Sequence, residues 1–119
     1  MGAVMLALCR RLLQLLALLL VVALVLWPQP ALAVADGSVL FENHCAGCHV
    51  NGGNIIRRGK TLKLAALERQ GLASPEAIAQ VAAAGIGQMS GYGAVLGEGG
   101  AEAVAAYVWA QAQAGWPRS

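Results

Sequence analysis

The sequence predicts a small all-α domain of three to four short helices with long loops, preceded by an apolar N-terminal leader. Three observations support this prediction. The chain of 119 residues has room for only one small domain. Several short segments place apolar residues at helical spacing, and no segment shows the alternation typical of a strand. Most of the 15 glycines lie between these segments, so the connections are expected to be loops.

The N-terminal part of the chain has the organisation of a secretory signal. Arg10-Arg11 precedes an uncharged apolar stretch over residues 12–26, and Ala31-Leu32-Ala33 offers a small-x-small cleavage site. This stretch has 15 residues, whereas a membrane-spanning helix needs about 20. The pattern therefore favours an export signal, with an uncleaved membrane anchor as the competing interpretation.

The expected domain organisation follows from this signal. Residues 1–33 are predicted to be a signal peptide cleaved after Ala33, with cleavage after Ala35 as the alternative, and residues 34–119 to form the mature domain. Cleavage removes two of the eight basic residues and none of the six acidic ones, so the mature chain has no net charge. Its charge therefore gives no reason to expect nucleic-acid binding, and we expect no stable membrane insertion after cleavage.

Local signals place the helices of the mature part. Ser74-Pro75-Glu76 combines a capping serine, a proline at the first helical position and an acid in the first turn. Thr61 is expected to cap the preceding short helix. Residues 50–60, with three glycines and two asparagines, are expected to form a loop. Residues 85–100 hold seven glycines in sixteen positions and are expected to form neither a helix nor a strand of their own. The predicted helices cover residues 36–46, 62–70, 75–84 and 101–114.

One motif carries specific chemistry, the sequence Cys45-Ala46-Gly47-Cys48-His49. C-x-x-C-H is the spacing at which c-type haem is attached. Two thiols about one helical turn apart can each bond one vinyl group of a porphyrin, and the adjacent imidazole can ligate the iron. We therefore predict one covalent haem c, held through Cys45 and Cys48, with His49 as an axial iron ligand.

Three other uses of these residues fit the sequence less well. A thioredoxin-like pair needs a βαβ setting, which the sequence lacks. A structural zinc site needs four ligands around the metal, but here His44, Cys45, Cys48 and His49 crowd into a few consecutive positions. A plain disulfide, common in exported proteins, leaves the histidine unexplained.

The second axial ligand has two candidates, His44 and Met89. His44 directly precedes Cys45 and is held beside His49, so we expect it to be a bystander. Met89 is the only methionine after the leader and lies 40 residues beyond His49, far enough for the chain to reach the opposite face of the ring. Core packing is the alternative role of a lone methionine. Ligation by both His49 and Met89 would leave no open iron position, which favours electron transfer over catalysis.

Residues 35–116 resemble the small class I c-type cytochromes, and most closely the cytochrome c6 family, soluble photosynthetic carriers of algae and cyanobacteria. The resemblance covers almost the whole mature chain and includes several motifs besides C-x-x-C-H. The matching residues are Gly37, Phe41, Cys45–His49, the Asn51-Gly52-Gly53-Asn54 run, Lys60-Thr61-Leu62, Leu67-Glu68, Met89, Leu96, residues 104–108 and Gly115-Trp116.

The resemblance implies a fold and a function. The first and last helices of the domain are expected to cross beside the haem, near Gly37, Phe41 and Tyr107. The protein is expected to be an electron carrier and not an enzyme, a monomer that takes electrons from the cytochrome b6f complex to photosystem I. Its expected address is the thylakoid lumen or the periplasm. A basic cluster over residues 57–69, with Arg57, Arg58, Lys60, Lys63 and Arg69 against Glu68, is expected to steer it to an acidic partner.

Three positions depart from the pattern of the family. Ser90 follows Met89 where relatives usually have proline, so a less rigid ligand loop is expected. Ala83 is placed where many relatives carry a glutamine near the haem. The absence of that glutamine is expected to lower the reduction potential. Val95 stands where relatives that dock on photosystem I often carry a basic residue. Alternative functions are therefore a carrier to a terminal oxidase or another low-potential chain, or a ligand-binding haem sensor or peroxidase-like enzyme in which the Met89 bond opens.

Overall fold

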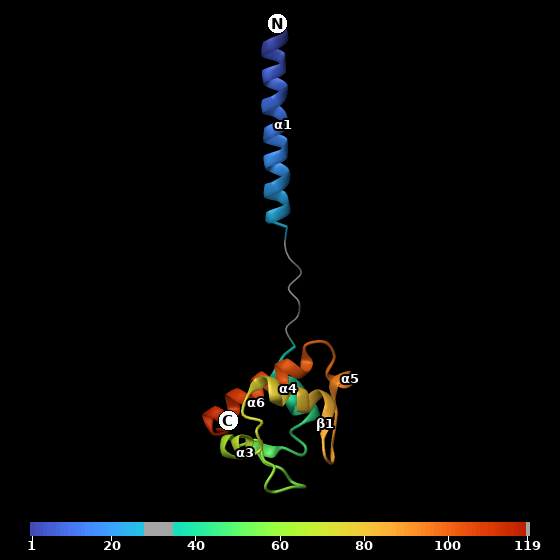
Figure 1. Ribbon diagram of the computed structural model, residues 1–119, viewed down its shortest axis with the longest axis vertical. Coiled ribbons are helices and arrows are strands. Elements are labelled where there is room, and N and C mark those ends of the chain that lie inside the picture. Colours follow the sequence, from blue (N-terminus) through green and yellow to red (C-terminus); the bar gives the residue numbers. More distant parts are fainter. Residues whose placement is uncertain (28–34, 119) are drawn as a thin grey trace. The chain divides into compact units, whose positions relative to one another are not determined.

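The computed structural model describes residues 1–27 and 35–118, and the chain divides into two compact units, Met1–Leu32 and Ala33–Ser119 (Figure 1). The first unit contains helix α1 (Gly2–Val25), which has 24 residues, a mean hydropathy of 2.2 over its most apolar window and no buried residue. By length and composition this helix is able to cross a membrane, as are many signal sequences. The cleavage predicted after Ala33 lies outside the described residues.

The second unit is the helical domain that the sequence predicts. Its four longer helices occupy the four predicted places, which confirms the all-α class. The elements are α2 (Gly37–His44), the 3₁₀ turn η1 (Val50–Gly52), α3 (Leu64–Arg69), α4 (Pro75–Ala84), strands β1 (Gly85–Ile86) and β2 (Met89–Ser90), α5 (Gly93–Leu96) and α6 (Gly100–Ala114).

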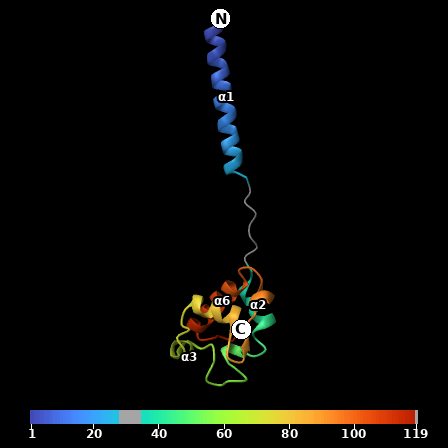
Figure 2. The same ribbon diagram turned by 45° about the vertical axis from the view of Figure 1, so that its right-hand side comes forward.

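Helix α6 is the centre of the core and packs against both α2 and α4, as Figures 1 and 2 show. Its buried side chains include Val104 and Val108, which lie one helical turn apart on the face toward the core. Gly37 of α2 lies directly against the backbone of Ala103, and the rings of Phe41 and Tyr107 have centroids 5.3 Å apart. The first and last helices of the domain therefore cross where the family resemblance places the crossing.

Capping explains the start of two helices. The Ser74 hydroxyl accepts a hydrogen bond from the Ala77 N–H at 3.1 Å, and Pro75 occupies the first position of α4, as predicted. The Asp36 carboxylate caps α2 by accepting from the N–H groups of Ser38 and Val39 at 3.0 and 3.4 Å. Both caps satisfy amide groups that have no partner inside the helix.

The Asp36 cap predicts a pH dependence of stability. Three hydrogen bonds lower the pKa of Asp36 below its usual 3.8. The largest effect comes from the Ser38 hydroxyl, followed by the N–H groups of Val39 and Ser38. A carboxylate with a lowered folded-state pKa contributes stability above its unfolded pKa, and this is lost as pH falls through the folded value. Urea unfolding of the holoprotein between pH 5 and pH 2 is expected to show this loss, and Asp36→Asn is expected to reduce its slope. Equal slopes in the two proteins would contradict the prediction.

Two local predictions are wrong. The cap of α3 is Lys63, which makes no side-chain capping bond, and not Thr61. Residues 85–100 were expected to form no helix or strand, but β1 and β2 pair antiparallel, with Gly85 opposite Ser90 and Ile86 opposite Met89, and α5 follows them. Backbone hydrogen bonds order this stretch, including one from the Tyr92 N–H to the Ala82 carbonyl at 2.8 Å.

Candidate haem-binding site

A cavity of about 500 Å³ brings together the residues that the sequence singles out. Cys45, Cys48 and His49 line it from the segment after α2, and Met89 lines it from β2. His44, the alternative ligand, lines it as well. A volume of this size lies in the range of pockets that enclose a cofactor or a drug-sized ligand.

The two cysteines sit on a single turn of backbone. The N–H groups of Cys48 and His49 both donate to the Cys45 carbonyl, at 3.1 and 3.0 Å. Both thiols are free; Cys45 is half-buried and Cys48 is exposed. Burial raises the pKa of the Cys45 thiol, and the neighbouring Cys48 raises it further. The turn thus presents two thiols at adjacent points of one cavity wall.

A hydrogen bond orients the ring of His49. The side chain is only 9% exposed, and Nδ1 lies 2.8 Å from the Gly53 carbonyl oxygen. A carbonyl only accepts, so Nδ1 is the protonated nitrogen, and the neutral form of the ring then has its lone pair on Nε2. Histidines that bind metals typically donate the other ring N–H in this way, which sets the ring orientation and raises the basicity of the ligand nitrogen.

Met89 is held by the β1–β2 hairpin, which closes against the end of α4. Gly91 allows this close approach, because a Cβ there would lie 2.5 Å from the Ala83 carbonyl oxygen and 2.7 Å from the Ala84 carbonyl carbon. The Met89 side chain is half-buried and lines the cavity. Strand pairing and packing on α4 therefore support the loop that carries Met89, while the looser ligand loop expected from Ser90 stays a prediction.

The rest of the cavity wall is largely apolar, with a basic edge. Arg57 and Lys60 line it from the loop after the cysteine motif. The apolar contributors come from several helices, strands and loops, and they are Ile56, Leu62, Leu67, Leu72, Val81, Ile86 and Tyr92. Such a wall excludes water from a bound planar group while leaving charge at its rim.

The structure corrects one assignment in α4. Ala83 was placed near the haem, but its side chain is exposed and is not among the residues that line the cavity. Val81 of the same helix lines the cavity instead. Sequence reasoning missed Val81 as a cavity residue. The only feature that could have identified it is its position on α4, one helical turn after buried Ile78.

This correction gives a prediction for the potential. Val81→Gln is expected to raise the reduction potential of the holoprotein by about 20–60 mV, the equivalent of one hydrogen bond. The amide NH₂ would add partial positive charge to the cavity wall, which disfavours the more positively charged oxidised state. Ala83→Gln, two residues away on the exposed face, is the matched control. Spectroelectrochemical titration checks both variants, and equal shifts in the two would contradict the role of Val81.

The residues present fit a covalent haem. Two free thiols lie on one turn, an imidazole offers an unprotonated Nε2, a thioether comes from a separate element, and an apolar wall encloses the space. The sequence predicted Cys45, Cys48, His49 and Met89, all of which line this cavity. It did not predict Gly53 as the hydrogen-bond acceptor of His49. The only sequence feature that points to Gly53 is its place in the Asn51–Asn54 run.

Comparisons with known proteins agree with this site. The family model described as cytochrome C oxidase, cbb3-type, subunit III matches residues 32–108. A "Cytochrome c6-like" protein of Nostoc sp. is 46% identical over 89 residues, which are 75% of this chain and 80% of that protein. Cytochrome c6 of Synechococcus sp. (strain ATCC 27167 / PCC 6312) is 41% identical over 109 residues, 90% of this chain and 97% of the relative.

Solved structures show the same likeness. Cytochrome c6B from Synechococcus sp. WH8102 superposes with a TM-score of 0.69 at 66% identity, covering 71% of this chain and 97% of that one. Cytochrome c6C from Synechococcus sp. PCC 7002 gives a TM-score of 0.64 at 51% identity, covering 66% and 96%. The diatom cytochrome c6 of Phaeodactylum tricornutum gives 0.66 at 36% identity, covering 70% and 98%.

The helical fold and the C-x-x-C-H cavity define a class I c-type cytochrome, a small domain with one covalently bound haem c. Within that class, the identity and coverage of its relatives show that the chain belongs to the cytochrome c6 family. Members of this family are exported soluble electron carriers, not enzymes.

Proposed function

We propose that this chain is an exported one-electron carrier in which Cys45 and Cys48 hold the haem through thioethers and His49 and Met89 are its axial iron ligands. The observation that carries the proposal is the shared cavity. All four residues line it, and the Nδ1–H of His49 is already engaged by Gly53, which leaves Nε2 for the iron. When bound, the haem supplies reversible one-electron exchange between ferric and ferrous iron.

The residues around the site suit such a carrier. His49 is held by its hydrogen bond to Gly53 and Met89 by its hairpin, so neither side chain needs to move when an electron arrives. Buried Leu67 and half-buried Leu62 and Leu72 keep water away from the interior. With both axial positions taken by the protein, small ligands find no open site, which favours electron transfer over catalysis.

The proposed electron path leads from the cytochrome b6f complex to photosystem I, in the thylakoid lumen or the periplasm. Support comes from the cytochrome c6 relatives and from the apolar α1 helix, which fits a signal peptide over residues 1–33. Redox titration of the mature holoprotein tests the path, since a clearly low potential would rule it out. N-terminal sequencing of the exported protein tests the signal peptide, because an intact α1 would instead identify a membrane-tethered cytochrome.

A second candidate is a carrier that serves a terminal oxidase. The observation that favours it is the matching family model, whose description names a subunit of a cbb3-type cytochrome c oxidase. Oxidation of the reduced holoprotein by oxidase-containing membranes, compared with oxidation by photosystem I particles, separates the two acceptors. Carbon monoxide separates either carrier from a haem sensor, because a site closed by His49 and Met89 is not expected to bind it readily.

The basic cluster of residues 57–69 lies beside this site. Arg57 and Lys60 line the cavity, and both side chains are exposed, as is that of Arg58. Charge at the mouth of a redox site steers encounters so that the cofactor edge meets the partner. We infer that this cluster guides the carrier to an acidic face on its partner.

Neutralising the cluster is expected to slow encounter. The double substitution Arg57→Gln/Arg58→Gln is expected to reduce the second-order rate of electron transfer to photosystem I about three- to tenfold at low salt. The difference is expected to disappear near 1 M salt, where the Debye length is about 3 Å. Arg118→Gln, at an exposed position outside both the cluster and the cavity lining, is the control for the single substitution Arg57→Gln, because each removes one positive charge. A similar loss in both single variants at low salt would show that only net charge matters.

A further inference from the structure

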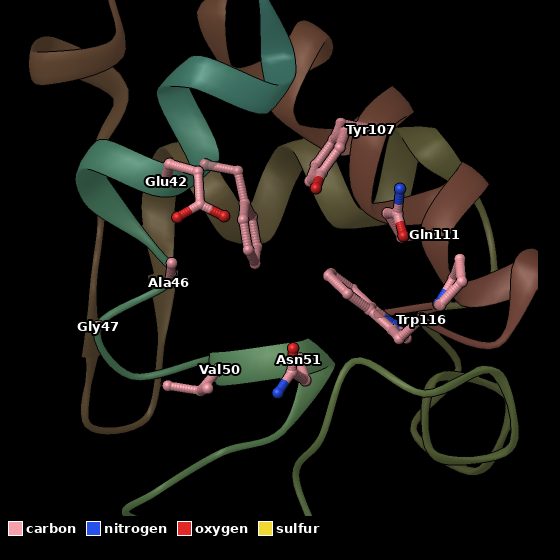
Figure 3. Close-up of a pocket in the computed structure, with 10 residues that line it drawn as sticks. Glu42, Ala46, Gly47, Val50, Asn51, Tyr107, Gln111 and Trp116 are labelled. Carbon is pink, nitrogen blue, oxygen red and sulfur yellow. The ribbon is translucent and has the colours of Figure 1, made fainter. Parts of the chain in front are cut away.

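Trp116, at the far end of the chain, is tied to the loop that follows the C-x-x-C-H motif. Its indole Nε1–H donates to the Leu62 carbonyl at 3.1 Å, across 54 positions of sequence. Its ring also covers Gly52, where a Cβ would lie 2.4 Å from three ring atoms. Figure 3 shows Trp116 beside the segment that carries Val50 and Asn51, with Tyr107 and Gln111 of α6 near it.

Hydrogen bonds continue from Trp116 to the imidazole of His49. Leu62, whose carbonyl Trp116 holds, donates its own N–H to the Gly52 carbonyl at 2.8 Å. Gly52 in turn donates to the His49 carbonyl at 3.0 Å, and the next residue, Gly53, accepts the His49 Nδ1–H at 2.8 Å. The indole of Trp116 thus holds the turn His49–Gly53 in two ways, by packing on Gly52 and by its hydrogen bond to Leu62. That turn orients the imidazole of His49.

The backbone of Trp116 points to the same role. Its φ is +55°, in the left-handed region that bulky side chains rarely adopt. Its N–H donates to the Gln111 carbonyl at 2.9 Å, closing the end of α6. Strained backbone of this kind persists where surrounding contacts over-determine it, and it gathers at functional positions. Here the strain aims the indole at Gly52 and Leu62.

We infer that Trp116 is a positioning residue for His49: by clamping Gly52 and Leu62 it keeps the Gly53 carbonyl in place to accept the imidazole N–H. The inference rests on the proposed role of His49 as an iron ligand. The hydrogen bond to Gly53 raises the electron-donating strength of the ring. Trp116 therefore acts on the reduction potential from outside the cavity, whose lining does not include it.

The test compares Trp116→Phe with Trp109→Phe in the mature holoprotein. Trp116→Phe keeps an aromatic ring over Gly52 but removes the donor to Leu62. Trp109, also half-buried and packed on the core from α6, undergoes the same chemical change. The measurements are hydrogen exchange of the His49 ring N–H by nitrogen-edited NMR of the reduced protein, and the reduction potential.

Trp116→Phe is expected to speed exchange of the His49 ring N–H at least tenfold. An imidazole that donates less electron density to the iron disfavours the oxidised state. The equilibrium between oxidised and reduced haem is therefore expected to shift about threefold toward the reduced form, which raises the reduction potential by about 30 mV at 59 mV per tenfold. Trp109→Phe is expected to leave both quantities as in the wild type.

Two other results separate the possible failures. If Trp116→Phe lowers the unfolding temperature but leaves the His49 exchange rate and the potential equal to those of Trp109→Phe, Trp116 is only a packing residue and the inference is wrong. If the His49 ring of the wild-type protein lacks the large ring-current shifts of a haem ligand, the proposed role of His49 as an axial ligand is wrong. That result does not depend on the role of Trp116.

Discussion

Gly91→Ala is expected to displace the Met89 ligand and to destabilise the holoprotein by about 1–3 kcal/mol, the usual cost of overpacking. The added Cβ would lie 2.5 Å from the Ala83 carbonyl oxygen and 2.7 Å from the Ala84 carbonyl carbon. Both contacts are with helix backbone, which cannot rotate away as a side chain can. The hairpin must therefore move off α4, and Met89 moves with it.

Two measurements check this prediction. Urea unfolding gives the loss of stability, and the absorption band of the methionine–iron bond in the oxidised protein gives the fraction still ligated. Gly59→Ala is the matched control, because a Cβ at Gly59 has no neighbour within 4 Å and the residue has no positive φ. A Gly91→Ala protein with the stability and absorption of Gly59→Ala would show that the hairpin does not depend on this close approach.

Helix α4 was predictable because its signals are local. Ser74 caps it, Pro75 begins it and Gly85 ends it, and each effect acts within a few residues. The start of α3 was not predictable in this way. The segment before it is fixed by distant partners, since the Leu62 N–H donates to Gly52 and its carbonyl accepts from Trp116. Contacts across 54 residues overrode the capping preference of Thr61.

The cysteine motif was readable for a different reason. Covalent attachment at two vinyl groups demands a fixed spacing, so Cys45, Cys48 and His49 appear together in sequence. Met89 was found because it is the only methionine after the leader. The hairpin that holds it was not found, since its two-residue strands are too short to show alternation and depend on pairing and on packing against α4.

The misplacement of Ala83 has a simple geometric cause. Two residues along an α-helix turn a side chain through about 200°, so an offset of two exchanges the cavity face for the exposed face. Sequence alone gave no register for α4 against the cavity, because Val81, Ala82 and Ala83 are all small and apolar. Packing of Ile78 and Ala82 into the core sets that register.

Met89→Ala is expected to open one axial position of the haem. Loss of the thioether would leave one axial position without its proposed protein ligand, so the reduced holoprotein is expected to bind carbon monoxide. Its reduction potential is expected to fall by on the order of 0.1–0.3 V, because Met/His ligation raises the potential and axial ligands as a group tune it over about 0.8 V. Absorption spectra under carbon monoxide and redox titration measure the two effects.

Ser90→Ala is the control for this experiment, since Ser90 is the exposed neighbour of Met89 on β2. It keeps the thioether and the strand pairing and is expected to match the wild type in both measurements. A Met89→Ala protein that keeps the wild-type potential and stays closed to carbon monoxide would contradict axial ligation by Met89. His44 would then be the side chain to examine, because it lines the same cavity and carries the chain's second imidazole. A double variant, Met89→Ala/His44→Ala, would show whether that imidazole closes the site.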